Sequence, residues 1–160
     1  MGRVTDTDRV KVRFRFPPDE DWPPVQSEGL WAEPLGDNRF RIDNTPWFAT
    51  NLAPEDVVEA LADSDGVLWM TRTITHSGRL VVRVIPFDDG PLGGDLQAVL
   101  DTFASLGVSG EGAAPAYPLV ALDIPPDSDL PAIVSKLRQG RADGSWDYDE
   151  GCVTERWLAL

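Results

Sequence analysis

The hydrophobic pattern of this chain changes at Pro86, and that change limits the folds open to it. Before Pro86, apolar and polar residues alternate over short runs such as residues 10–16. A period of two predicts half-buried strands. After Pro86, apolar residues return at helical spacing, first at Leu96, Val99 and Leu100. The sequence therefore predicts an α+β protein in which strands come first and helices alternate with strands afterwards.

The first half predicts a small antiparallel β-barrel or curled sheet over residues 10–78, after a flexible N-terminus of residues 1–9. A proline-rich loop at residues 17–24 cannot be helical. Gly36, Asp37 and Asn38 suit a hairpin turn. We expect one helical turn at Pro54 to lead into the next strand. The predicted strands are residues 10–16, 27–35, 39–42, the end of 54–62, 67–75 and 79–87.

The second half predicts a ferredoxin-like α/β sandwich with two helices over residues 79–160, sharing a core with the first half. Asp95 caps the first helix, which ends at Gly107, and Ser128 caps the second, which ends at Gly140. We expect residues 110–115 to form a flexible connection, and residues 119–124 and 145–154 to form strands. The strand at residues 79–87 would serve both halves.

The charge is strongly negative and unevenly distributed. The chain has 27 Asp and Glu against 14 Lys and Arg, and residues 87–160 hold thirteen of the acidic residues but four of the basic ones. Such a surplus argues against nucleic acid and anionic membranes as partners. One cysteine, no long apolar run and no apolar leader favour a cytoplasmic protein.

No motif in the sequence points to catalysis. The one histidine, His76, lies beside Ser77 in a predicted turn, where adjacent side chains generally point apart. Cys152 has no basic motif nearby, and the acidic run that begins at Asp147 departs from the EF-hand pattern. We therefore expect no catalytic residue, metal or cofactor. The alternative is an enzyme or small-ligand protein using a cleft between the two subdomains, with these residues at its mouth: Asp43, Asn44, Trp47 and His76.

The segment at residues 142–157 combines aromatic and acidic side chains near the C-terminus. Its carboxylates would attract a basic protein surface, and its tryptophans belong to a residue type enriched at binding hot spots. A solvated acidic strand edge that prevents aggregation is the structural alternative. The contact with a partner would centre on Trp146, Asp147, Tyr148, Asp149, Glu150 and Trp157.

The stretch at residues 30–60, LWAEPLGDNRFRIDNTPWFATNLAPEDVVEA, followed by THSGRLVVRV, resembles a bacterial family catalogued as domain of unknown function 4265. The resemblance covers most of the chain and implies a fold more than an activity; Trp47 stands where the family is expected to have Phe. The ending GSWDYDEGCVTERW is similar, with permuted residues, to the last strand of the B-type protein regulator of RNase E, a small acidic ferredoxin-like inhibitor.

These observations favour a non-enzymatic, cytoplasmic, acidic protein-binding module of inhibitor, immunity or regulatory type, which would cover a basic surface on a protein partner. A structural or oligomerisation module is a third hypothesis. The sequence leaves open the oligomeric state, the identity of the partner, whether any catalysis occurs and whether the C-terminal carboxylates bind a cation.

Overall fold

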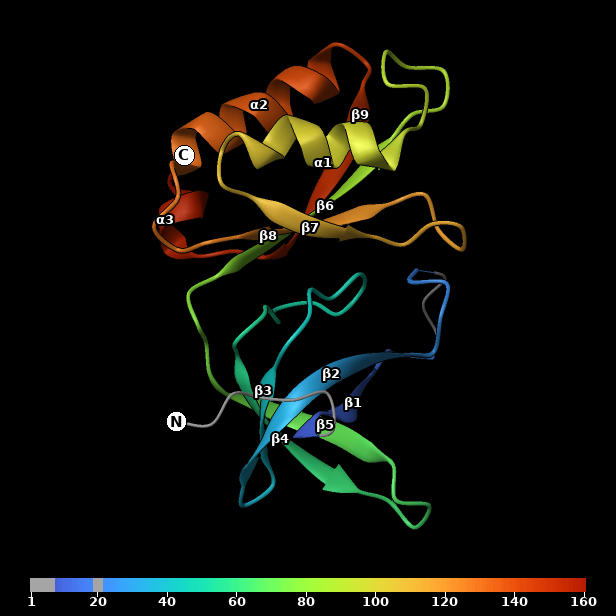
Figure 1. Ribbon diagram of the computed structural model, residues 1–160, viewed down its shortest axis with the longest axis vertical. Coiled ribbons are helices and arrows are strands. Elements are labelled where there is room, and N and C mark those ends of the chain that lie inside the picture. The colour runs from blue at the N-terminus through green and yellow to red at the C-terminus, as the bar shows by residue number, and fades with distance from the viewer. Residues whose placement is uncertain (1–7, 19–21) are drawn as a thin grey trace. The chain divides into compact units, whose positions relative to one another are not determined.

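The chain forms two compact units, Met1–Ser77 and Gly78–Leu160, and each is described by itself. The structure is a computed structural model that describes residues 8–18 and 22–160 (Figure 1). Residues 1–7 of the expected flexible N-terminus and residues 19–21 of the expected proline-rich loop lie outside this range. A barrel followed by a sheet with helices confirms the predicted α+β class. Among the described residues, no helix has the length and apolar character needed to cross a membrane.

The first unit is a closed five-stranded barrel. Each strand pairs antiparallel with the next one in the chain, and β1 closes the barrel by pairing with β5. Because strand direction alternates over an odd number of strands, the closing pair is parallel, with Val12 opposite Leu68. The strands are β1 (Val10–Arg15), β2 (Ser27–Gly36), β3 (Arg39–Ile42), β4 (Val57–Ala62) and β5 (Leu68–Thr75).

The barrel core follows the alternation seen in the sequence. In β3, Phe40 and Ile42 are buried while Arg39 and Arg41 are exposed. Each fully buried large aliphatic side chain contributes about 1.5–3 kcal/mol. The core consists of Val12, Leu30, Ala32, Phe40, Ile42, Ala49, Leu52, Val58 and Ala60.

The helical turn expected at Pro54 is a β-turn. The amide of Asp56 donates to the carbonyl of Ala53 at 3.2 Å, and Glu55 has a φ of 70°. Proline presets the backbone of the second turn residue, and the following residue then takes a positive φ. The chain enters β4 directly afterwards, because Val58 and Ala60 face the barrel core.

The second unit is an antiparallel sheet with α1 and α2 on one side (Figure 1). Its sheet order is β7-β8-β6-β9, and its first six elements follow the predicted order of strand, helix, strand, strand, helix, strand. The elements are β6 (Leu80–Pro86), α1 (Leu96–Ala104), β7 (Ser109–Gly112), β8 (Val120–Ile124), α2 (Leu130–Ala142), β9 (Trp146–Cys152) and α3 (Glu155–Leu158).

Four details of the second unit differ from the sequence predictions. The strand β6 belongs to the second sheet, where it pairs with β8 and β9, and is not a strand of the barrel. The expected flexible connection overlaps the edge strand β7, in which Gly110 lets the backbone pack closely on Ala121 of β8. Asp129, not Ser128, caps α2 by accepting from the amide of Ala132. The short helix α3 follows the predicted last strand.

Trp146 organises the packing of α2 on the sheet. Its ring is buried, lies 5.6 Å from that of Phe103, and its indole N–H donates to the carbonyl of Leu137. Gly140, in the same helix, has no side chain, and a Cβ there would overlap Cε2 and Cζ2 of Trp146. The sequence predicted that α2 ends at Gly140, but the helix continues to Ala142. Glycine is needed within this helix because the indole of Trp146 occupies the space that a side chain would fill.

We predict that Gly140→Ala destabilises the second unit. Helix propensity alone would raise stability by about 1 kcal/mol, whereas the clash with Trp146 should lower it by about 1–3 kcal/mol. Urea unfolding decides between the two signs. Gln139→Ala, at the exposed neighbour in α2, is the matched control and should stay within about 0.5 kcal/mol of the wild type. A more stable Gly140→Ala protein would contradict this packing.

A second prediction concerns the turn between β4 and β5. The indole N–H of Trp69 donates to Asp63 at 2.9 Å, and this bond, followed by the amide of Val67, lowers the pKa of Asp63 from its ordinary value of 3.8. Because the pKa of Asp63 is lower in the folded protein than in the unfolded chain, its ionised carboxylate stabilises the fold at pH values above 3.8. This contribution to the free energy of unfolding is lost as the pH falls through the lowered pKa.

Trp69→Phe should therefore raise the pKa of Asp63, which carboxyl NMR titration measures, and the stability difference from the wild type should narrow on acidification. Glu59 is the internal control, because its lowered pKa comes first from the hydroxyl of Thr71 and then from Arg72. An unchanged Asp63 titration would show that the indole is not the cause.

Candidate functional site

A buried carboxylate, Glu28, holds the loop between β3 and β4. Its two oxygens accept the amides of Trp47, Phe48 and Ala49 at 2.7, 3.0 and 2.8 Å. Hydrogen bonds to a charged acceptor are stronger than neutral ones, and they satisfy amides that would otherwise be buried without partners. The loop is consequently fixed to β2 through Glu28.

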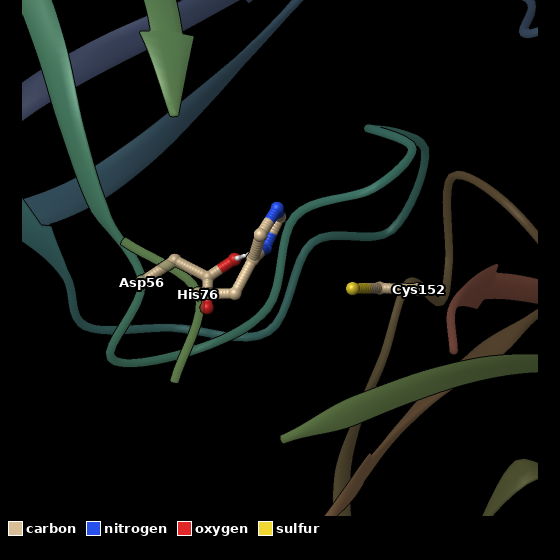
Figure 2. A group of neighbouring side chains, drawn as sticks. All are labelled: Asp56, His76 and Cys152. Carbon is tan, nitrogen blue, oxygen red and sulfur yellow. Dashed lines mark hydrogen bonds and ion pairs between the residues drawn. The ribbon is translucent and has the colours of Figure 1, made fainter. Parts of the chain in front are cut away.

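Asp56 is the second buried carboxylate of this loop, and it contacts His76 (Figure 2). Its oxygens accept the amides of Ala53 at 3.0 Å and Ser77 at 2.7 Å, and its Oδ2 lies 3.2 Å from Nδ1 of His76. The side chain of Asp56 is 1% exposed and that of His76 is 60% exposed. The carboxylate therefore orients an imidazole that remains open to solvent.

An imidazole oriented by a carboxylate is the arrangement used for general acid–base work. Here the neighbouring hydroxyl of Ser77 donates to the carbonyl of Pro54 at 2.8 Å, so its proton is already engaged. Within the described part of the first unit, Asp56 and His76 supply two potential metal ligands at this position, whereas a protein zinc site has three or four protein ligands. The pair can bind or move a proton, and the hydroxyl beside it in the first unit, that of Ser77, is not positioned as an activated nucleophile.

The other three predicted cleft residues make separate contacts. Asp43 forms an ion pair with Arg9, and the Oδ1 of Asn44 accepts the amide of Trp31 at 2.8 Å. Trp47 is half-buried and donates its amide to Glu28. A pocket of about 660 Å³ in the first unit is lined by other residues, among them Arg15, Gln26 and Trp69. The contacts of these three residues thus anchor the loop between β3 and β4 to its surroundings.

The predicted partner-binding segment forms β9, an edge strand that pairs with β6. The side chains of Asp147 and Asp149 are 62% and 58% exposed, and Glu150 is also exposed. Tyr148 is half-buried under the guanidinium of Arg141, 3.8 Å from the ring centre. Four of the six predicted contact residues therefore reach the surface.

The other two, Trp146 and Trp157, are buried, with 3% and 4% of their surface exposed. Each indole N–H has a partner inside the second unit: the carbonyl of Leu137 for Trp146, and the carboxylate of Glu150, at 2.9 Å, for Trp157. The structure thus places both rings in the core of the second unit and not at its surface.

The sequence analysis missed the role of Glu28. Its position carries a signal, since Glu28 shares the inward parity of Leu30 and Ala32 on β2, and a carboxylate on the core side of a strand needs buried donors. Asp56 lacks such a signal, because its burial depends on the turn that precedes β4. Arg83 is also buried and its Nε donates to Asp149 at 2.8 Å, but it lies on the face of β6 opposite the core residues Val82 and Val84, so its burial has no such signal.

We predict that Glu28→Gln destabilises the barrel by about 2–4 kcal/mol, because a neutral amide accepts more weakly and brings an N–H group to face backbone donors. Urea unfolding measures the loss, and hydrogen exchange should show faster exchange at Trp47, Phe48 and Ala49. Glu33→Gln, on the same strand, removes the same charge from an exposed ion pair with Arg41 and should cost under about 1 kcal/mol. Equal losses in the two variants would contradict the role of Glu28.

Comparison with known proteins places the fold and the family. A solved structure from Neisseria gonorrhoeae, described as that of a hypothetical protein, superposes with a TM-score of 0.72 at 18% identity, covering 91% of this chain and 94% of that one. This likeness shows the fold. No curated protein matches the sequence. The model of the family described as Domain of unknown function (DUF4265) matches residues 28–148. The matched residues include Glu28 on β2 and the loop that it holds. Because the match covers most of the chain, the chain belongs to the DUF4265 family.

Proposed function

We propose that this protein is a non-enzymatic, cytoplasmic binding module, of inhibitor, immunity or regulatory type, that covers a basic surface on a protein partner. The observation that carries the proposal is the exposed acidic surface of β9, defined as Asp147, Tyr148, Asp149 and Glu150. The resemblance of this segment to an acidic RNase inhibitor supports the same kind of function by analogy.

The charge balance of the second unit supports this proposal. Residues 78–160 hold thirteen Asp and Glu against six Lys and Arg. Three of the six cations already pair with carboxylates: Arg79 with Asp123, Arg83 with Asp149 and Arg141 with Asp147. A net negative surplus therefore remains at the surface. Such a field raises the association rate with a cationic partner, and the effect weakens as salt screens it.

The edge of β9 is partly covered by its own unit. Arg141 donates from Nη2 to the carbonyl of Tyr148 at 2.6 Å while its guanidinium stacks on the ring. A covered edge disfavours pairing with another strand. In our proposal, the partner consequently contacts β9 through the acidic side chains and not by extending the sheet.

A second candidate function, an enzyme or small-ligand protein, is favoured by one observation: the buried Asp56 orients the exposed His76. In that case the important residues would be Asp43, Asn44, Trp47 and His76. Binding of the natural ligand would then be independent of the carboxylates on β9, which the following experiment tests.

We predict that the triple variant Asp147→Asn, Asp149→Asn, Glu150→Gln, which neutralises the carboxylates of β9, no longer captures the partner protein. The tagged wild type should retain a basic protein from the native cell lysate at low salt and release it at moderate salt. The matched control is Asp88→Asn, Asp89→Asn and Asp127→Asn, which removes three exposed charges from the same unit outside β9. It should retain the partner nearly as well as the wild type.

The association rate with the captured protein, once identified, should fall about tenfold or more for the β9 variant and show a weaker salt dependence. Thermal unfolding establishes that both triple variants are folded. Equal retention by the two variants would contradict the proposal, and stabilisation of the chain by a small molecule in all three proteins would favour the second candidate.

A further inference from the structure

The first unit carries a basic stripe on the outer face of its barrel. On β1, Lys11, Arg13 and Arg15 point away from the core residue Val12, as the alternating pattern requires. Alternate residues on a strand lie about 6.7 Å apart, so the three cations form a regular row. Two tryptophans flank this row, Trp31 on β2 and Trp69 on β5. We define the basic stripe as Lys11, Arg13, Arg15, Trp31 and Trp69.

The strand register explains why these five side chains meet. Lys11 lies opposite Trp31 on β2, and Arg13 lies opposite Trp69 on β5. The amino group of Lys11 is 4.5 Å from the centre of the Trp31 ring, and the guanidinium of Arg15 is 4.0 Å from that of Trp69. Lys11 and Arg15 are therefore each held against an aromatic face, which limits the motion of their side chains before a partner binds.

Gly29, opposite Arg13 on β2, leaves room for the long side chains of the stripe. A Cβ at this position would lie 2.8 Å from Cδ of Lys11 and 3.0 Å from Nη1 of Arg13. The two long side chains thus lie across β2 at the place where a larger residue would lift them. At the other end, Arg15 and Trp69 line the open pocket of about 660 Å³, so the stripe leads into a concave surface.

The cations of the stripe differ from Arg9, Arg41 and Arg72 of the same unit, which form ion pairs with carboxylates. Within residues 8–18 and 22–160, no carboxylate forms an ion pair with Lys11, Arg13 or Arg15; Arg13 donates instead to the hydroxyl of Ser27 at 3.3 Å. Asp63 accepts a hydrogen bond from Trp69, and the charge of Arg15 attracts it without an ion-pair contact between them. The three pairs are Arg9 with Asp43, Arg41 with Glu33 and Arg72 with Glu59.

We propose that the basic stripe is a docking surface for an acidic segment of a partner protein. Carboxylates on alternate residues of an extended segment have the same spacing as Lys11, Arg13 and Arg15. Trp31, 44% exposed, and Trp69 supply apolar area beside the charges, and Trp and Arg are the residue types that most often dominate binding energy. This surface is distinct from β9 and attracts chemistry of the opposite sign.

Two observations favour a protein segment over a single-stranded nucleic acid. One face of each indole ring is occupied by a cation of the chain itself, whereas nucleotide binding uses open aromatic faces on which bases stack. The chain carries a net charge of −13, which opposes a long polyanion more than a short acidic segment. A segment of a few residues needs contacts at the stripe alone.

The test uses a fluorescein-labelled ten-residue polyglutamate peptide and the full chain, with anisotropy as the readout at about 50 mM salt, where the Debye length is roughly 14 Å. The wild type should bind the peptide, and binding should weaken with salt. The triple variant Lys11→Ala, Arg13→Ala, Arg15→Ala should raise Kd about tenfold, since each exposed charge contact changes Kd roughly two- to threefold.

The matched control is Arg39→Ala, Arg41→Ala, Arg72→Ala, which removes three charges from exposed side chains of the same barrel outside the stripe. It should bind the peptide nearly as the wild type does. Trp31→Ala should also weaken binding, whereas Trp22→Ala, at another exposed tryptophan, should not. This second pair of variants tests the stripe without altering charge, should the triple variant fail to fold.

Four outcomes would overturn the proposal. The first is no binding of the peptide by the wild type at millimolar concentration, and the second is an equal loss in the two triple variants. The third is tighter binding of a ten-nucleotide deoxythymidine oligomer than of the peptide, lost in the stripe variant, which would assign the stripe to nucleic acid. Sedimentation of the wild type alone checks for a second copy as occupant; a dimer that the stripe variant abolishes would equally overturn it.

Discussion

The acceptance of three consecutive backbone amides by Glu28 is the interaction on which the first unit most depends. A loop that enters a core must find partners for its amides, and each amide left unsatisfied would cost about 1–3 kcal/mol. With Trp47, Phe48 and Ala49 held by the carboxylate, the loop places Leu52 in the barrel core. The barrel therefore uses a charged side chain to permit apolar packing.

The acidic residues of this chain consequently have two roles, because some are buried and structural and others are exposed at the surface. Glu28 and Asp56 are buried and bound by amides, so they contribute to the architecture and offer little to a partner. Asp147 and Asp149 are more than half exposed, and each shares its charge with one arginine. The net charge of −13 is therefore a poor guide to function until each carboxylate is assigned to the core or to the surface.

The sequence could predict the features that depend on residues close together in the chain, and could not predict those that depend on contacts formed only in the folded protein. Alternation and helical spacing depend on neighbours in the chain, so the barrel strands, the order of the second unit and the cap at Asp95 were predictable. The burial of Trp146 and Trp157 was not, because both lie on a segment that reads as an exposed edge. Their burial depends on partners at Leu137 and Glu150 that only the folded chain brings near.

The same argument explains how one acidic chain can present surfaces of both signs. At physiological salt the Debye length is about 8 Å, so a partner in contact responds to the charges within one or two side chains, whereas the net charge governs only the approach. Lys11, Arg13 and Arg15 lie in a row whose two ends stack on indoles, and within the described chain no carboxylate forms an ion pair with them, although Asp63 attracts Arg15. Selectivity for a short acidic segment then follows from local geometry, and the surplus of negative charge elsewhere discourages longer polyanions.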